Sequence, residues 1–272
     1  MLLESIDFTF GLYKFKELNY MKLRLLRNAT LFLESDNGTL LIDPMFSAKG
    51  ELGAFPYLDD KRENPLVDLP VTNAELELLV SKVDAILLTH SHPDHWDVAA
   101  QNMLPRDIPV FCQIEDRDML QSIGFTNVTP IFVRFDFKGF TFYRTDGKHG
   151  IGQIGELMGK VSGFIIEQNE ERIYIAGDTV WCSDVSDAIA KYTPNHIVIN
   201  GGAAQFSIGD HVTMNRDDLL KIYQYYPQAN YYVVHLETVT PVVETRERIK
   251  VFLKEASLSN KFVVPDDGAY LF

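Results

Sequence analysis

Residues 87–97 read Leu-Leu-Thr-His-Ser-His-Pro-Asp-His-Trp-Asp and hold three of the chain's seven histidines, directly after an apolar run. His90 and His92 are two residues apart, so in an extended segment both imidazoles point to the same side. Asp94 and His95 follow a proline, where the chain is expected to turn. Imidazole and carboxylate groups are ligands that zinc takes, with an open position where the metal is catalytic. The stretch therefore predicts a metal-binding loop that can serve two neighbouring ions.

A purely structural role fits these three histidines poorly. Buried side by side, they would repel one another when protonated and leave polar ring atoms unpaired. A single histidine in a strand pattern, such as His196, is by contrast expected to be structural.

Four further residues each follow an apolar strand pattern at or near its end. Strand ends can meet at one edge of a sheet, and a shared metal site requires such a meeting point. We therefore expect these residues to complete the site, although an aspartate in Gly-Asp-Thr can also be a simple turn residue. The four residues are Asp43, His149, Asp178 and His235.

The predicted elements alternate between hairpins and inserted helices. This order predicts an α/β (α+β) fold, a four-layer αββα sandwich of two mixed sheets flanked by helices, with the ligands on loops along one edge. Strands are predicted over 21–26, 29–33, 39–42, 83–88, 109–112, 131–133, 135–137, 140–143, 163–168, 172–176, 196–200, 231–234 and 262–264, and helices from about residue 72 and over 97–104, 115–123, 216–226 and 244–256.

The domain organisation is predicted to be simple. Residues 21–272 show no repeat, low-complexity tract or linker, which favours a single domain. Residues 1–20 are rich in aromatics and precede a second methionine, so they are either an extra strand or arm, or an artefact of the assigned start. Residues 45–72 form a long irregular loop, which is typical of a lid or pocket wall.

Composition narrows the function classes. A formal net charge of −13 disfavours nucleic-acid binding, which needs a basic surface. No apolar run approaches the roughly 18 residues of a membrane span. Two cysteines and the lack of a signal-like N-terminus fit a reducing cytosol. We therefore expect a cytoplasmic protein with a small-molecule substrate, no nucleic-acid partner and no membrane partner, and we leave a homo-oligomer open.

The His-x-His-x-Asp-His motif at residues 90–95 resembles that of the metallo-β-lactamase-fold hydrolase superfamily. Trp96-Asp97 follows the motif, and in this the chain resembles the branch of the superfamily that contains the ascorbate-6-phosphate lactonase group. The resemblance continues in the family's order through His149, the Gly-Asp-Thr at 177–179 and His235, and it covers the chain from about residue 21 to the end.

The resemblance implies a metal-dependent hydrolase with two divalent ions, zinc first, manganese also fitting and iron less so. A hydroxide shared by ions about 3.5–4 Å apart would attack a small ester, lactone or phosphoester. In this assignment Asp178 bridges the ions. The implied ligands of one ion are His90, His92 and His149, and those of the other are Asp94, His95 and His235.

Several residues are predicted around these ligands. Asp43 would support a ligand imidazole from behind. Trp96 and Trp181 border the site, where they either line a pocket or simply pack. His211 is either a pocket-lining proton donor or a surface residue beside the next helix. The predicted catalytic residues are Asp94, Asp178 and His211.

The chain departs from the family pattern at two places. The usual Gly-His near the first strand is replaced by Arg27-Asn28-Ala29, and residues 201–214 expand the family's Gly-Gly…Thr-Met stretch. Because of both departures, the resemblance does not identify the substrate, whereas the implied metal site is unaffected. Two alternatives remain on the same fold: a non-haem di-iron redox protein, which usually has a glutamate at the position of His92, and a metal-retaining binding protein without catalysis.

Overall fold

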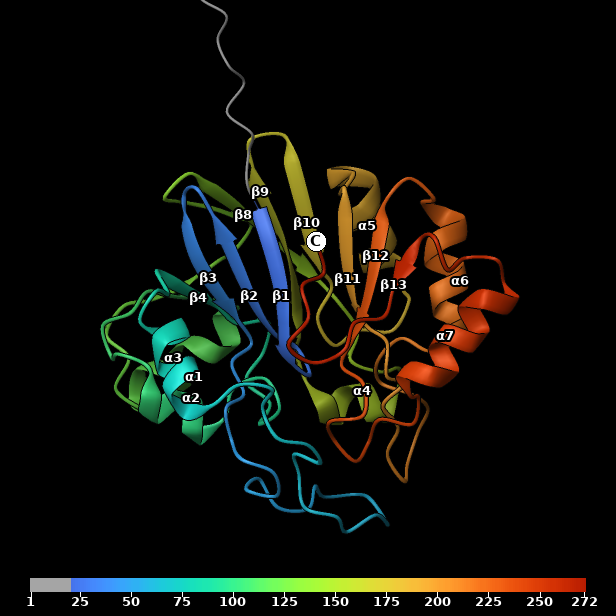
Figure 1. Cartoon of the computed structure of the whole chain (residues 1–272), viewed down its shortest axis with the longest axis horizontal. Coiled ribbons are helices and arrows are strands. Elements are labelled where there is room, and N and C mark those ends of the chain that lie inside the picture. The colour runs from blue at the N-terminus through green and yellow to red at the C-terminus, as the bar shows by residue number, and fades with distance from the viewer. Residues whose placement is uncertain (1–20) are drawn as a thin grey trace, which may run out of the picture.

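The computed structural model describes residues 21–272, so the predicted extension at residues 1–20 lies outside the described residues. Two mixed β-sheets face each other in the middle of the molecule, one of six strands and one of seven. Helices cover both outer faces, as Figure 1 shows. The predicted four-layer αββα sandwich is confirmed.

The first sheet begins as an antiparallel meander of three strands, to which three further strands add in parallel. Its strands, in spatial and sequence order, are β1 Met21–Arg27, β2 Thr30–Ser35, β3 Gly38–Ile42, β4 Ala85–Leu87, β5 Val110–Cys112 and β6 Val128–Pro130.

The second sheet repeats this plan, because four antiparallel strands are followed by three that add in parallel. Its strands are β7 Arg134–Phe137, β8 Phe140–Asp146, β9 Ser162–Gln168, β10 Glu171–Ile175, β11 His196–Asn200, β12 Asn230–Val234 and β13 Phe262–Val263.

The helices divide between the two sheets. Those on the first sheet are α1 Asn73–Val80, α2 Val98–Met103 and α3 Arg117–Ser122, the last preceded by the 3-10 turn η1 Ile114–Asp116. Those on the second are α5 Ser183–Tyr192, α6 Arg216–Tyr225 and α7 Arg246–Glu255. The short helix α4 Gln153–Met158 lies at one end of the sandwich (Figure 1). No helix in the described part of the chain is long and apolar enough to cross a bilayer.

Apolar side chains from the facing sides of the sheets fill the space between them. Leu23, Leu31 and Leu40 of the first sheet share one buried cluster with Phe142 and Phe164 of the second. Burying a side chain of this size contributes about 1.5–3 kcal/mol. This central layer fixes the distance between the sheets, and therefore the distance between loops that leave them at the same edge.

Three elements differ from the sequence prediction. Helices α4 and α5 were not foreseen, although Val185, Ala188 and Ile189 of α5 have the spacing of a buried helical face. The strand expected at 131–133 lies instead at β6, three residues earlier. Short apolar stretches fit more than one element, and packing against the neighbouring strand decides which forms.

Candidate metal centre and its pocket

The structure brings all seven predicted metal ligands to one edge of the sandwich, in two adjacent groups. Within each group one ligand atom per residue lies within 4.8 Å of the others. The first group, called here the histidine cluster, is His90, His92 and His149. The second, called the mixed cluster, is Asp94, His95, Asp178 and His235.

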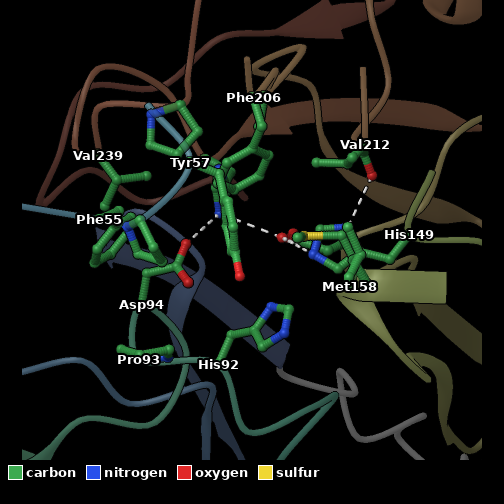
Figure 2. Close-up of a pocket in the computed structure, with 16 residues that line it drawn as sticks. Phe55, Tyr57, His92, Pro93, Asp94, His149, Met158, Phe206, Val212 and Val239 are labelled. Atoms are coloured by element: carbon green, nitrogen blue, oxygen red, sulfur yellow. Dashed lines mark hydrogen bonds and ion pairs between the residues drawn. The ribbon is translucent and has the colours of Figure 1, made fainter. Parts of the chain in front are cut away.

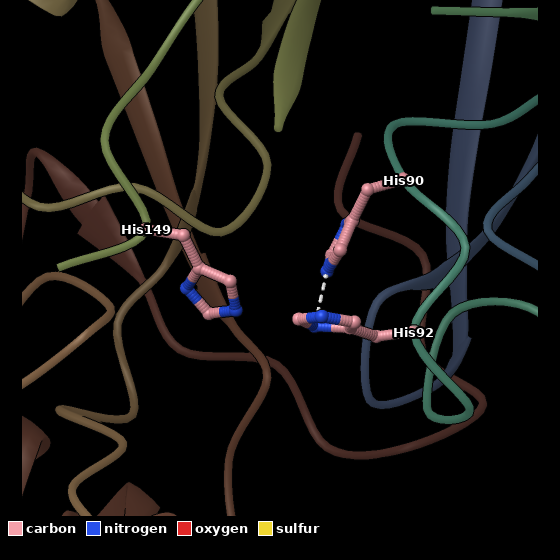
Figure 3. A group of neighbouring side chains, drawn as sticks. All are labelled: His90, His92 and His149. Carbon is pink, nitrogen blue, oxygen red and sulfur yellow. Dashed lines mark hydrogen bonds between the residues drawn. The ribbon is translucent and has the colours of Figure 1, made fainter. Parts of the chain in front are cut away.

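In the histidine cluster, neighbouring polar groups set the orientation of two rings. Thr89 Oγ1 donates to Asp43 Oδ2 over 2.7 Å, so it is free only to accept from His90 Nδ1 at 3.1 Å. His149 Nδ1 likewise donates to the Val212 carbonyl over 2.9 Å. Both contacts place the ring proton on Nδ1, so each Nε2 carries the lone pair that a metal would take. His90 Nε2 lies 3.0 Å from His92 Nδ1. Figure 3 shows His90 and His92 on one loop, with His149 facing them from across the site.

Asp178 lies where the two clusters meet. Its Oδ2 is 3.3 Å from His95 Nε2, 3.6 Å from His149 Nε2 and 3.7 Å from His235 Nε2. Its other oxygen accepts a hydrogen bond of 2.6 Å from Asn200 Nδ2 at the end of β11. The carboxylate therefore reaches ligands of both clusters, which is the position a bridging group requires.

Asp43 supports the site from behind, at the end of β3. It accepts hydrogen bonds from the Thr89 backbone (2.8 Å) and hydroxyl, and its Oδ2 lies 2.8 Å from His95 Nδ1. A carboxylate in this position fixes the imidazole so that Nε2 faces the metal. His95 Nε2 is buried and has no hydrogen-bond partner among the described residues. Such an orphaned ring nitrogen fits a metal ion.

The two clusters differ in their electrostatics. Burial lowers the pKa of His149 to about 4 and holds that of His90 well below its usual value. Burial has the same tendency at His95, but Asp178, Asp94 and Asp43 outweigh it and raise its pKa well above the usual value. The pKa of Asp178 is held well below its usual value by His235 and His95, against the opposing effect of burial. The mixed cluster thus attracts positive charge.

An apolar pocket of about 280 Å³ opens above the clusters. Five predicted ligands form its polar part, namely His92, Asp94, His149, Asp178 and His235. Its other lining residues are Phe55, Pro56, Tyr57, Pro93, Leu157, Met158, Ala204, Phe206, Val212, Val239 and Pro241. Figure 2 shows Phe55, Phe206 and Val239 around the opening above Asp94 and His92.

The loops expected to form the pocket do so in part. Residues of the 45–72 loop and of the 201–214 stretch line it, while α4 and the segment 239–241 are walls that the sequence did not indicate. Leu157 and Met158 could not be predicted as pocket residues because the sequence did not indicate helix α4. Residues 239–241 belong to no recognisable sequence motif.

The two tryptophans predicted to border the site, Trp96 and Trp181, lie outside the pocket lining. Trp96 is buried against Phe125, with ring centroids 5.3 Å apart, and Trp181 packs beside Tyr225. For both, simple packing is what the structure shows.

His211 is not brought to the pocket. Its Nε2 lies 3.2 Å from the Asp218 carboxylate in the first turn of α6, and its Nδ1 lies 3.1 Å from Asp210. The structure therefore matches the surface alternative beside the helix, and a catalytic role of His211 stays a prediction that the geometry does not support.

Besides Asn200, two residues for which the sequence predicted no role hold the site in place, Asn28 and Arg27. Asn28 has a left-handed φ of 58°, and its Nδ2 donates to the Asp94 carbonyl (3.1 Å) and carboxylate (3.4 Å). Its own carbonyl accepts from the His235 amide over 2.9 Å. The buried Arg27 guanidinium donates to the carbonyls of Met45, Ser47 and Val67 and so anchors the loop after β3. The only signal was the departure from the family's Gly-His at this position.

Comparison with known proteins agrees with this geometry. Residues 39–236 match the family model described as β-lactamase superfamily domain. The UPF0173 protein YddR of Bacillus subtilis is 36% identical over 257 residues, covering 93% of this chain and all of YddR.

Two solved structures are also similar. One is a possible metal-dependent hydrolase from Veillonella parvula, with a TM-score of 0.88, 33% identity and coverage of 93% of this chain and 99% of that one. The other is an isothiocyanate hydrolase from Delia radicum gut bacteria, with a TM-score of 0.87, 35% identity and the same coverage. The chain therefore belongs to the β-lactamase superfamily, in its group of metal-dependent hydrolases.

Proposed function

We propose that the protein is a dinuclear metal-dependent hydrolase that acts on a small, uncharged, largely apolar molecule. The observation that carries this proposal is the placement of two ligand clusters, joined by Asp178, at the base of an apolar pocket.

Two divalent ions fit the ligand set, zinc first and manganese second, because imidazole and carboxylate together do not select one metal sharply. When bound, they would supply a hydroxide nucleophile near neutral pH and positive charge where negative charge develops on the substrate. Among the described residues, the orphaned His95 Nε2 and the shared Asp178 Oδ2 are the features that call for cations.

The chain's own residues position these ligands. Asp178 would bridge the ions, and its bond from Asn200 fixes which oxygen faces them. Asp43 holds the His95 ring, and Asn28 holds the Asp94 carboxylate. Groups held in this way need no rearrangement during the reaction, which is the main source of electrostatic catalysis.

The pocket supports an uncharged substrate. No lysine or arginine is among its described lining residues, so a phosphoester would find no cationic side chain there. Because a similar structure at 35% identity is an isothiocyanate hydrolase, we place isothiocyanates, R–N=C=S with an apolar R group, first. Small esters and lactones have an equally uncharged electrophilic carbon and come next.

The test begins with metal content. The protein is stripped with a chelator, reloaded with Zn²⁺ or Mn²⁺ and assayed with benzyl isothiocyanate, phenyl acetate, γ-butyrolactone and bis(4-nitrophenyl) phosphate. We expect two ions per chain and metal-dependent turnover of the uncharged substrates, with release of benzylamine from the isothiocyanate. A reversible iron redox signal would support the di-iron alternative instead, and tight metal without turnover of any substrate would support a binding protein.

A further inference from the structure

Tyr57 carries an unusual side chain for its place in the pocket. Of the described lining residues, five are predicted metal ligands and ten have apolar side chains. Tyr57 is the remaining one, and its hydroxyl makes no hydrogen bond to another described residue. Among the described lining residues, Tyr57 is therefore the one side chain besides the metal ligands that can donate a hydrogen bond to a substrate.

The loop that carries Tyr57 is fixed at its base. Leu52 donates to the Asn64 carbonyl over 2.7 Å, and Asn64 donates back to the Gly53 carbonyl over 2.8 Å. The Asn64 side chain accepts from the Thr240 amide over 2.8 Å, which ties the base of the loop to the 239–241 wall. The loop is therefore a closed hairpin attached to the pocket.

The tip of this loop is also held in place. The Tyr57 carbonyl accepts a hydrogen bond of 2.9 Å from the Ser207 amide, next to the lining residue Phe206. Its backbone has a φ of 59°, in the left-handed region that non-glycine residues seldom adopt. Tyr57 is 61% exposed although it lines the pocket, so it stands at the mouth, and in Figure 2 its side chain crosses the middle of the view.

We infer that the Tyr57 hydroxyl donates the proton that the substrate needs when its reacting bond breaks. The inference rests on the proposed hydrolase function. Nucleophilic attack on R–N=C=S puts negative charge on nitrogen and sulfur. With an ester, negative charge reaches the leaving oxygen when the tetrahedral adduct breaks its C–O bond. A tyrosine hydroxyl is a proton donor, whereas the apolar walls offer none.

In the hydrolysis of an isothiocyanate, Tyr57 would protonate the nitrogen. The hydroxide oxygen bonds to the central carbon, the C=N π pair moves to nitrogen, and the Tyr57 proton goes to that nitrogen, giving R–NH–C(=S)–OH. The tyrosinate then takes a proton from water, which replaces the hydroxide consumed. The acid breaks its C–N bond, its O–H proton moves to nitrogen, and the products are R–NH₂ and COS.

The test compares Tyr57→Phe with the wild type at equal metal content. We expect kcat for benzyl isothiocyanate to fall by about 10²-fold, the lower end for loss of a general acid, with KM changed less than about threefold. The matched control is Tyr225→Phe, which removes the hydroxyl of an exposed tyrosine outside the pocket lining and should leave both constants unchanged.

A substituent series separates proton donation from a structural role. The defect of Tyr57→Phe should be largest for 4-methoxyphenyl isothiocyanate and shrink towards 4-nitrophenyl isothiocyanate, whose nitrogen tolerates negative charge. If Tyr57→Phe lowered kcat by the same factor for every isothiocyanate of the series, the inference would be overturned.

A binding measurement keeps the outcome separate from that of the proposed function. Aniline, the uncharged amine product of phenyl isothiocyanate, should bind Tyr57→Phe about 2- to 10-fold more weakly in calorimetry. Equal aniline binding and equal kcat would overturn the Tyr57 inference and leave the hydrolase standing. A metal-loaded wild type without turnover would overturn the hydrolase proposal, while weaker aniline binding by the variant would still support the Tyr57 hydrogen bond.

Discussion

The histidine cluster and the mixed cluster lie side by side, yet they are built differently. The histidine cluster contains three imidazoles, and burial keeps the pKa of His90 and of His149 below the usual value. The mixed cluster pairs two imidazoles with two carboxylates, and those carboxylates raise the pKa of His95 and His235 despite burial. Burial therefore favours the neutral form of His90 and His149, whereas the mixed cluster is a buried site whose carboxylates favour positive charge.

The support behind the two clusters also differs. The ligands of the histidine cluster are oriented by a threonine hydroxyl and a backbone carbonyl. The mixed cluster is supported by the side chains of Asp43, Asn28 and Asn200. From the carboxylates and this denser support we infer that the mixed cluster holds its ion more tightly.

The largest expected effect comes from removing the group that joins the clusters. In Asp178→Ala, metal content should fall to one ion or none, because both clusters lose their shared oxygen. Turnover should fall by about 10³-fold or more. Mass spectrometric metal analysis and the substrate panel measure both. Asp136→Ala, at an exposed carboxylate on β7, is the control and should change neither. Full activity with two ions bound would show that Asp178 is no bridge.

A matched pair of histidine variants tests the inferred difference in affinity. His149→Ala should keep about one ion under mild chelation, because the carboxylate-bearing mixed cluster is intact. His235→Ala should lose metal at lower chelator concentration, since it removes a ligand from that cluster. Chelator titration followed by metal analysis gives the two midpoints. If His149→Ala loses its last ion as easily as His235→Ala does, the ranking of the clusters is wrong.

Asn28 offers a smaller and more selective change. Asn28→Gly keeps the left-handed backbone available and removes only the amide beside Asp94. Affinity for the more tightly held ion should fall about 10- to 100-fold, as for other supporting groups. Asn169→Gly is the control, because Asn169 has nearly the same φ (57°) in a hairpin turn between β9 and β10. Thermal melts of both metal-free variants should shift alike, and a specific loss of metal-free stability in Asn28→Gly would indicate a purely structural role.

His211 should have the smallest effect, because it contacts neither cluster. The hydrogen bond to Asp218 raises its pKa, partly opposed by burial, and Asp210 adds to the rise. A raised pKa means that the stabilisation is complete below the unfolded value of about 6.5 and is lost as the pH rises through the folded value.

The corresponding measurement is a set of melting curves for metal-free wild type and His211→Ala. The variant should be less stable than the wild type below about pH 6.5, and the difference should shrink as the pH rises above that value. It should retain metal, and its turnover should stay within about twofold of the wild type. Lost metal would make His211 a ligand, and a large loss of turnover with metal retained would restore the catalytic role that its sequence position suggested.

The sequence by itself determined the chemistry of the metal centre. His90, His92, Asp94 and His95 lie on one short loop, so their proximity is guaranteed by chain connectivity once β4 delivers the loop to the sheet edge. The order of apolar strands and helices was enough to predict the two flanked sheets, because periodic burial is a local property of the sequence.

Only the tertiary structure decided what surrounds those ligands. Asn28 meets Asp94 across 66 positions of the chain, and the pocket combines loops from residue 55 to residue 241. No local sequence pattern indicates that Tyr57 lines the apolar pocket, where it is the polar side chain besides the metal ligands among the described lining residues. Metal ligands recur as motifs because coordination demands particular side chains at particular spacings. A pocket wall demands only shape and polarity, which many residues satisfy, and it exists only after distant segments have packed together.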